Sequence, residues 1–277
     1  MAGSATQNDP LVITTAAQLA EIADLVNRGR LERFIFNDSN ATVYLKLGND
    51  IDLSLYGMNW NNGKRWIPIG TYANPFKGHF DGNGKTITGL YINDDTLMYA
   101  GLFGAVRSGN IQALALESVH ISGNDYTGGV AGGVFENSVI KNCYSSATVS
   151  GTSKAGGVAG FVENSTMESC YSTGEVKCSE STGIAGGVAG EVKNGTVKNC
   201  AAFNSVVEAS GPNVGRIAGH NEGILVGNAV FSGMTITING SLKTPDSNPE
   251  GPDGEDITAG QIKANGTIGN RFTAEGG

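Results

Sequence analysis

The segment Gly156-Gly157-Val158-Ala159-Gly160 decides the fold, because close variants of it occur five times at nearly constant spacing. The five units begin at Ala100, Gly128, Gly156, Gly186 and Gly215, so successive units are 28, 28, 30 and 29 residues apart. A unit of this length is too short to bury its own apolar residues, so neighbouring units must stack. Helical repeats of similar length are rich in Ala, Leu, Glu and Lys. These units instead contain Gly, Val, Ser, Thr and Asn, which favour short strands and tight turns.

Apolar residues recur at fixed places in each unit and define columns that should stack inside the molecule. The first column is Leu102, Val130, Val158, Val188 and Ile217, the second is Ile111, Ile140, Met167, Val197 and Val226, and the third is Leu114, Cys143, Cys170, Cys200 and Ala229. A turn column contains Asn137, Asn164 and Asn194. The second and third columns are three residues apart, which would place them on opposite faces of a flat strand. We therefore expect a bend between them.

These features predict an all-β fold, a right-handed parallel β-helix. Each unit would form one coil of three short strands and three turns, with neighbouring coils about 4.8 Å apart. The handedness follows from the rule for crossovers between parallel strands. The repeated glycines fit tight inner corners, because a nucleotide-phosphate loop would be needed only once.

Composition excludes several classes of protein. The chain has 277 residues, 42 of them Gly, and a formal net charge of −8. This acidic balance argues against a nucleic-acid partner, because phosphate binding depends on clustered Lys and Arg. No apolar run is long enough to span a membrane, and the first residues show neither the basic nor the apolar part of a signal peptide.

We expect one structural domain with four segments. These are a disordered start at 1–9, a helical cap with irregular leading coils at 10–99, five regular coils at 100–240, and an acidic loop with a closing segment at 241–277. In the cap, Thr15 and Gln18 fit a capping box and Gly29 fits a helix stop. One helical face would carry Leu19, Ile22, Leu25 and Val26 and would cover the unpaired edge of the first coil.

Several short motifs occur in an order that resembles a known family. They are Leu-Gly-Asn-Asp-Ile-Asp-Leu at 47–53, Trp-Ile-Pro-Ile-Gly at 66–70, Phe-Lys-Gly-His-Phe-Asp-Gly-Asn-Gly at 76–84, and Gly-Leu-Phe-Gly at 101–104 with the later Gly-Gly-Val-Ala-Gly units. Together they resemble the GLUG-motif family of bacterial surface and secreted proteins over about residues 12–240. The resemblance implies a parallel β-helix in an exported protein, often within a larger surface protein. It supplies no catalytic residue, because the motif is structural. The last unit departs from the pattern, with Arg216 at the second Gly and Ala229 at the Cys position.

The segment 241–256 is rich in acidic residues and proline, and we expect a solvated, mobile loop. The alternative is a calcium site, because Asp246, Asn248 and Glu250 offer oxygen ligands at alternating positions before Gly251. The match to an EF-hand loop is incomplete, because its twelfth position would be Ile257 rather than Glu.

The cysteines are predicted to be structural. Cys143, Cys170 and Cys200 share the third column, so we expect buried free thiols that face inward. A linear stack cannot form a tetrahedral metal site, whereas a disulfide between neighbouring coils remains geometrically allowed. Cys178 lies outside the column and is expected to be more exposed.

Other reactive side chains are scattered. His79, His120 and His220 are far apart in repeat terms and fit turn or surface positions better than a catalytic triad. Glu136 and Glu163 are expected side by side on adjacent coils, in a charge ladder that continues as Lys193. Tyr144 and Tyr171 share a column and should stack, with sugar binding as the alternative to simple packing.

These observations favour a non-catalytic extracellular module of a bacterial surface protein, acting as a stalk or an adhesive, ligand-presenting surface. The alternative is a glycan-cleaving enzyme with a carboxylate-lined groove on the same scaffold. The expected partner is a glycan or a cell-surface protein, and the chain is expected to be a monomer or part of a larger chain. The sequence assigns no catalytic residue, no metal site and no cofactor, and it does not identify the residues that bind a ligand.

Overall fold

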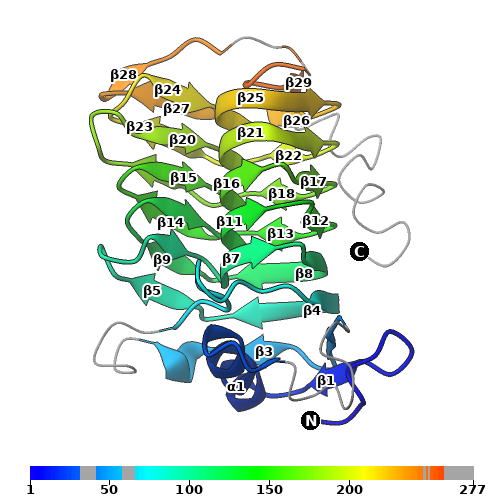
Figure 1. Cartoon of the computed structure of the whole chain (residues 1–277). Helices are drawn as coiled ribbons and strands as arrows, with labels where there is room; N and C mark the ends of the chain where they lie inside the picture. The colour runs from blue at the N-terminus through cyan, green and yellow to red at the C-terminus, as the bar shows by residue number, and fades with distance from the viewer. Residues whose placement is uncertain (32–41, 58–65, 246–247, 249, 259–277) are drawn as a thin grey trace.

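Parallel strand pairing runs through the stack from the first coil to the last (Figure 1). This computed structural model describes residues 1–31, 42–57, 66–245, 248 and 250–258. The predicted all-β parallel solenoid is confirmed, with one α-helix near the N-terminus.

The strands form three stacks that make the lateral faces of the solenoid. The largest sheet contains β1 (Leu11–Ile13), β2 (Tyr44–Leu47), β3 (Ile51–Asp52), β4 (His79–Thr88), β7 (Phe103–Arg107), β8 (Asn110–Glu117), β11 (Ala131–Phe135), β12 (Val139–Lys141), β13 (Tyr144–Ser145), β16 (Ala159–Glu163), β17 (Thr166–Glu168), β18 (Tyr171–Ser172), β21 (Ala189–Lys198), β22 (Ala201–Ala202), β25 (Ala218–Val226), β26 (Ala229–Phe231) and β29 (Glu255–Ile257). A second sheet contains β5 (Tyr91–Asn93), β9 (His120–Ser122), β14 (Thr148–Gly151), β19 (Val176–Cys178), β23 (Val206–Ala209), β27 (Thr235–Ile238) and β28 (Ser241–Leu242). The third contains β6 (Tyr99–Ala100), β10 (Tyr126–Gly128), β15 (Lys154–Gly156), β20 (Ile184–Gly186) and β24 (Asn213–Gly215).

The predicted bend between the second and third columns is confirmed. Ile140 pairs in register with Met167, and Tyr144 pairs with Tyr171, which places Cys143 beside Cys170. The residue before each cysteine has a positive φ, namely 53° at Asn142, 53° at Ser169 and 52° at Asn199. One left-handed residue turns the chain sharply, so both columns face the core although they are three residues apart.

The last coil shows where the predicted columns were wrong. Val197 pairs with Leu225 rather than Val226, and Ala201 pairs with Ala229, which places Asn228 beside Cys200. The pairing of β21 with β25 shifts by one residue between Lys193 and Thr196. Val226 is therefore exposed on the surface, whereas Asn228 is buried and its Oδ1 accepts a hydrogen bond from the Cys200 N–H at 2.9 Å.

The paired glycines form the tight corner between the third sheet and the largest sheet. A Cβ on Gly157 would lie within 3 Å of the carbonyl oxygen of Gly187 in the next coil, and a Cβ on Gly187 would meet the carbonyl oxygen of Arg216 in the same way. Real Cβ atoms do not approach this closely, so the repeated glycine is required for coil stacking.

The predicted cap helix is α1 (Ala16–Asn27), at the N-terminal end of the stack (Figure 1). The Thr15 side chain accepts a hydrogen bond from the Gln18 N–H, as expected of an N-cap. The Gln18 side chain accepts from the Thr14 N–H at 2.7 Å, one residue earlier than in a standard capping box. Gly29 has a φ of +63° and ends the helix. The predicted face is buried in the core, at Leu19, Ile22, Leu25 and Val26.

The expectation of a disordered start at 1–9 is wrong. Ala2 accepts a hydrogen bond from the Val12 N–H at 2.7 Å, and the buried Ala5 accepts one from the Tyr44 N–H. These bonds satisfy backbone groups on the outer edge of the first coil, which the sequence predicted to be covered by the cap helix alone.

The acidic segment is also more ordered than expected in the part that the structure describes. Asp253 is buried, accepts a hydrogen bond from the Arg216 N–H at 3.1 Å and pairs with Lys243 at 3.3 Å. Strand β29 pairs with β26, and Asp256 on β29 forms an ion pair with the buried Arg216. Both carboxylates close the last coil by pairing with Arg216 and Lys243, Asp253 from a buried position and Asp256 from a partly exposed one.

Candidate functional site

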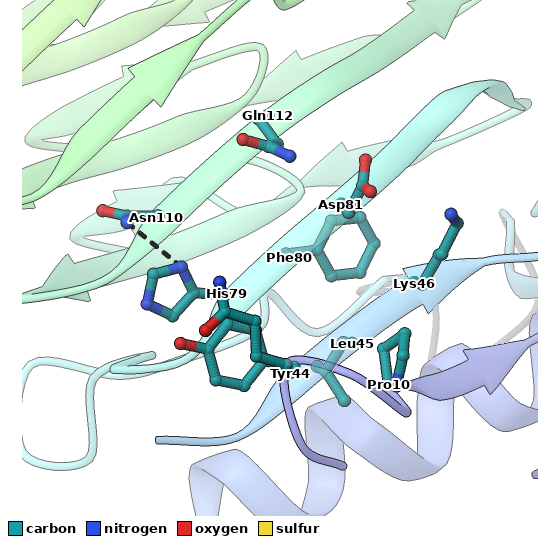
Figure 2. A pocket seen from close by; sticks show the side chains of 10 residues that line it. Pro10, Tyr44, Leu45, Lys46, His79, Phe80, Asp81, Asn110 and Gln112 are labelled. Carbon is teal, nitrogen blue, oxygen red and sulfur yellow. Dashed lines mark hydrogen bonds between the residues drawn. The ribbon is translucent and has the colours of Figure 1, made fainter. Parts of the chain in front are cut away.

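A groove of about 250 Å³ lies on the outer face of the first coils, across strands β2, β4 and β8 (Figure 2). Side chains that alternate outward along these strands form two columns, because successive residues of a strand point to opposite sides. One column is Tyr44, His79 and Asn110, and the other is Lys46, Asp81 and Gln112. The lining is completed by Leu45 and Phe80, which lie between the two columns, and by Gln7 and Pro10 from the N-terminal segment.

The first column of this groove is internally fixed. The rings of Tyr44 and His79 are stacked with centroids 4.4 Å apart, and Asn110 Nδ2 lies 3.1 Å from His79 Nδ1. Burial lowers the pKa of His79 below its ordinary value, because desolvation penalises the imidazolium. The lowered pKa favours the neutral imidazole, and its Nδ1 accepts the hydrogen bond from the Asn110 amide N–H.

A second feature of the surface is an aromatic cluster that the sequence analysis did not identify. Phe135 and Phe161 are buried against each other outside the coil core, with Tyr99 and Tyr126 packed on them. Tyr72, Tyr99 and Tyr126 stack in succession at 5.8 and 5.0 Å. Tyr99 and Tyr126 are adjacent on paired strands, a signal readable from the repeat register once the units before the Gly-Gly corner are aligned.

The ring faces in this cluster are already occupied. Lys154 pairs in register with Tyr126, and its Nζ lies 4.7 Å from the centroid of the Tyr126 ring. The guanidinium of Arg107 lies 5.1 Å from the centroid of the Tyr72 ring. Burial, with smaller effects of Tyr126 and Tyr72, raises the pKa of Tyr99 to about 12. A sugar ring stacks on a free aromatic face, and this cluster offers mainly edges and hydroxyl groups. It therefore packs the segment around Tyr72 onto the solenoid.

The predicted stacking of Tyr144 and Tyr171 is confirmed. Their centroids are 4.3 Å apart with an interplanar angle of 19°, and Phe203 contacts Tyr171 edge-on. Burial and the neighbouring Tyr144 raise the pKa of Tyr171 to about 12. The inner faces of this pair are used for packing as well.

The expected pairing of Glu136 with Glu163 is wrong. Glu163 is in register with Phe135 on one side and Lys193 on the other, while Glu136 has a φ of 51° and follows the strand. Each carboxylate has its own cation, because Glu163 pairs with Lys193 at 3.4 Å and Glu136 with Arg107 at 3.5 Å. The predicted ladder continues from Glu163 to Lys193, but it does not contain a pair of carboxylates suited to glycoside hydrolysis.

The cysteines are buried, as predicted for Cys143, Cys170 and Cys200, and all four are free. Burial raises the pKa of Cys170 and Cys200 well above the ordinary thiol value. The expectation of a more exposed Cys178 is wrong, because its Sγ donates to the Thr152 carbonyl at 3.1 Å under a covering loop. Burial raises the pKa of Cys178 to about 11. Thiols of this kind are poor nucleophiles at neutral pH.

The three histidines are apart in the structure, as predicted. The His120 ring contacts the Tyr91 ring in a tilted arrangement with centroids 4.8 Å apart, and His220 Nε2 lies 3.4 Å from Glu222 on the last coil. Within the described part of the chain, no group of three metal-ligating side chains converges. The calcium hypothesis depends on Asp246, which lies outside the described residues.

These features define the class of protein as a parallel β-solenoid that carries the GLUG motif. The model of "The GLUG motif" matches residues 123–150, which is the coil from Gly123 to Ser150. This match confirms the resemblance to the GLUG motif within this one coil.

Two longer proteins are similar to the chain in sequence. One is named "Putative Gly-rich membrane protein" from Evansella cellulosilytica, with 35% identity over 121 residues, 43% of this chain and 12% of that protein. The other is named "Halomucin" from Haloquadratum walsbyi, with 35% identity over 132 residues, 47% of this chain and 1% of that protein. The matched regions are therefore small parts of these relatives.

A solved structure shares the fold. It is the crystal structure of a "putative immunoglobulin A1 protease" from Bacteroides ovatus, with a TM-score of 0.69 and 21% identity, covering 96% of this chain and 88% of that one. At this identity the likeness shows the fold alone. In the described residues, no helix has the length and apolar character to cross a membrane.

Proposed function

We propose that the chain is a non-catalytic extracellular module of a surface protein, in which the solenoid is a stiff stalk that presents its lateral faces to a glycan or protein partner. The observation that carries this proposal is the continuous parallel register from β1 to β29, with a single apolar core along the stack. The regular coils are bonded to their neighbours along all three faces, which supports stiffness along the axis.

The comparisons support the surface location. The two relatives are named "Putative Gly-rich membrane protein" and "Halomucin", and this chain is similar to only a small part of each. A module repeated or inserted within a long exported protein would have this relation to its relatives.

The described side chains favour presentation over catalysis. All four thiols are buried, and burial raises the pKa of Cys170, Cys178 and Cys200. The two candidate glutamates are separately paired with cations. A nucleophile beside a base, or two carboxylates across a groove, are common arrangements for peptide or glycan cleavage, and these side chains form neither.

Two measurements test the proposal. Intact cells of the source organism are treated with an impermeant biotin reagent, and the protein should be labelled without lysis. The purified chain is incubated with polysaccharides and with immunoglobulin A1, and no new reducing ends or fragments should form. Labelling only after lysis would contradict the location, and product formation that one carboxylate or serine variant abolishes would contradict the non-catalytic role.

A further inference from the structure

We infer that the groove across β2, β4 and β8 is a binding site for a neutral saccharide chain. The inference deepens the proposed function, on which it rests, by naming one of the lateral surfaces and the chemical class of its ligand. Its floor is the outer face of three paired strands, and its polar groups are supplied by three successive coils (Figure 2).

The lining is suited to hydroxyl groups. Asn110 and Gln112 carry side-chain amides, each of which both donates and accepts hydrogen bonds, as sugar hydroxyls do. Asp81 adds an acceptor and Lys46 a donor, so adjacent hydroxyls of one ring can each find a complementary group. In contrast, an apolar ligand would leave these groups unsatisfied.

Several of these groups have unused hydrogen-bonding capacity. Asp81 Oδ1 accepts from the Asn83 N–H at 2.8 Å, and its second oxygen remains available. Among the described residues, the Lys46 ammonium and the Gln112 amide make no hydrogen bond or ion pair. The groove therefore presents donors and acceptors that only solvent or a ligand satisfies.

The balance of charge selects a neutral ligand. Lys46 and Asp81 carry opposite charges in register on neighbouring strands, and the lowered pKa of His79 favours its neutral form. A ligand of either charge would therefore meet one attractive and one repulsive group, so the groove offers no net attraction to an anion or a cation. A neutral polyhydroxylated ligand can use both groups as hydrogen-bond partners.

The repeat of the scaffold favours a chain over a single sugar. The polar columns advance by one coil spacing, about 4.8 Å, from β2 to β4 to β8. The groove ends at β12, where Val139 follows Asn110 in the column. A short run of consecutive rings could thus lie across the three strands.

Affinity electrophoresis tests this inference, with the chain run through gels that contain a β-glucan, a mannan, a galactan or polygalacturonate. We expect retardation in at least one neutral polysaccharide gel. Gln112→Ala and Lys46→Met should each weaken that retardation about five- to tenfold, the effect of losing a hydrogen bond to the ligand. Lys141→Ala is the matched control, because Lys141 is in register with Gln112 one coil further along, outside the groove.

The unfolding temperature of each variant is measured beforehand, and both groove variants should match the parent chain because these side chains are outward and unpaired. No retardation in any neutral gel, or retardation only in polygalacturonate, would overturn this inference about the groove. Neither result would affect the proposed surface location, which the biotin labelling of intact cells tests separately. Retardation that Lys46→Met with Gln112→Ala does not change would also overturn it, while leaving saccharide presentation to another face.

Discussion

The second glycine of the corner motif differs between the middle of the stack and its end. At Gly129, Gly157 and Gly187 a side chain would collide with a carbonyl oxygen of the next coil. At the same place in the last coil, Arg216 is almost completely buried and pairs with Asp256 on the closing strand. The residue at this position therefore differs with the place of the coil in the stack. Glycine allows a further regular coil to pack against it, whereas the long side chain of the last coil pairs with the closing strand.

The largest expected effect comes from adding one methyl group at the middle position. Gly157→Ala should lower the free energy of unfolding by about 3 kcal/mol or more, because the Cβ meets backbone that cannot move without separating two coils. Urea unfolding followed by circular dichroism measures the change. The matched pair is Arg216→Gly and Arg216→Ala, which should differ by less than about 1 kcal/mol with Ala the more stable. An equal cost of the methyl group at both sites would refute the comparison.

The next effect concerns the ion pair at the end of the stack. Asp256→Asn should cost about 2 kcal/mol, because it leaves the buried guanidinium of Arg216 without its carboxylate. Arg216→Met should cost less, because the Asp256 side chain is 44% exposed and water can solvate it. Thermal unfolding of both variants checks the order. Glu255→Gln, on the exposed neighbour, is the control and should change little; a larger loss for Arg216→Met would reverse the argument.

Much of the solenoid was predictable from the sequence because stacked coils repeat the same packing at each step. The sequence correctly predicts the inward columns through Val158, Met167 and Cys170, because every coil there has neighbours on both sides. The last coil was misaligned by one residue because Leu225 and Val226 are equally apolar. Only the strand pairing distinguishes which of the two faces the core.

A smaller effect is expected at the bend between the second and third columns. The residue at the bend has a positive φ in three successive coils. It is Asn142 in the first of these coils, Ser169 in the second, with a φ of 53°, and Asn199 in the third. Ser169→Asn should stabilise the chain by about 0.5 kcal/mol, because asparagine adopts the left-handed region more readily. Ser169→Val should destabilise it by about 1 to 2 kcal/mol for the opposite reason. Chemical denaturation midpoints measure both, and a stabilising valine would exclude the left-handed bend.

The smallest effect is expected on the exposed ladder. Lys193→Ala removes the ion pair with Glu163. The Lys193 side chain is 45% exposed and the Glu163 side chain 31%, so the variant should lower the free energy of unfolding by less than about 0.5 kcal/mol. The difference should disappear in high salt, because screening weakens exposed pairs. A loss as large as that of Asp256→Asn would show that exposed and capping ion pairs are not energetically different.

The surface sites were less predictable than the core. The sequence placed Glu136 and Glu163 together because each directly precedes an asparagine of the turn column, Asn137 or Asn164. The strands instead pair at a step of 28 residues, which puts Glu163 beside Phe135 and leaves Glu136, with its positive φ, in the turn. The groove near His79 combines residues of three coils from the less regular leading part, including the N-terminal segment at Gln7 and Pro10. No repeat marks those residues, so only the folded chain brings them together.

Disulfide trapping across neighbouring coils tests the central claim, that consecutive coils stack in register, most directly. Lys141 and Glu168 are paired outward residues of β12 and β17, and the native thiols are buried and unreactive. Lys141→Cys with Glu168→Cys should form a disulfide under mild oxidation, because adjacent parallel strands lie within the allowed Cα separation. Lys141→Cys with Lys198→Cys, two coils apart, should not. Equal cross-linking of both pairs, or of neither, would contradict the stacked register.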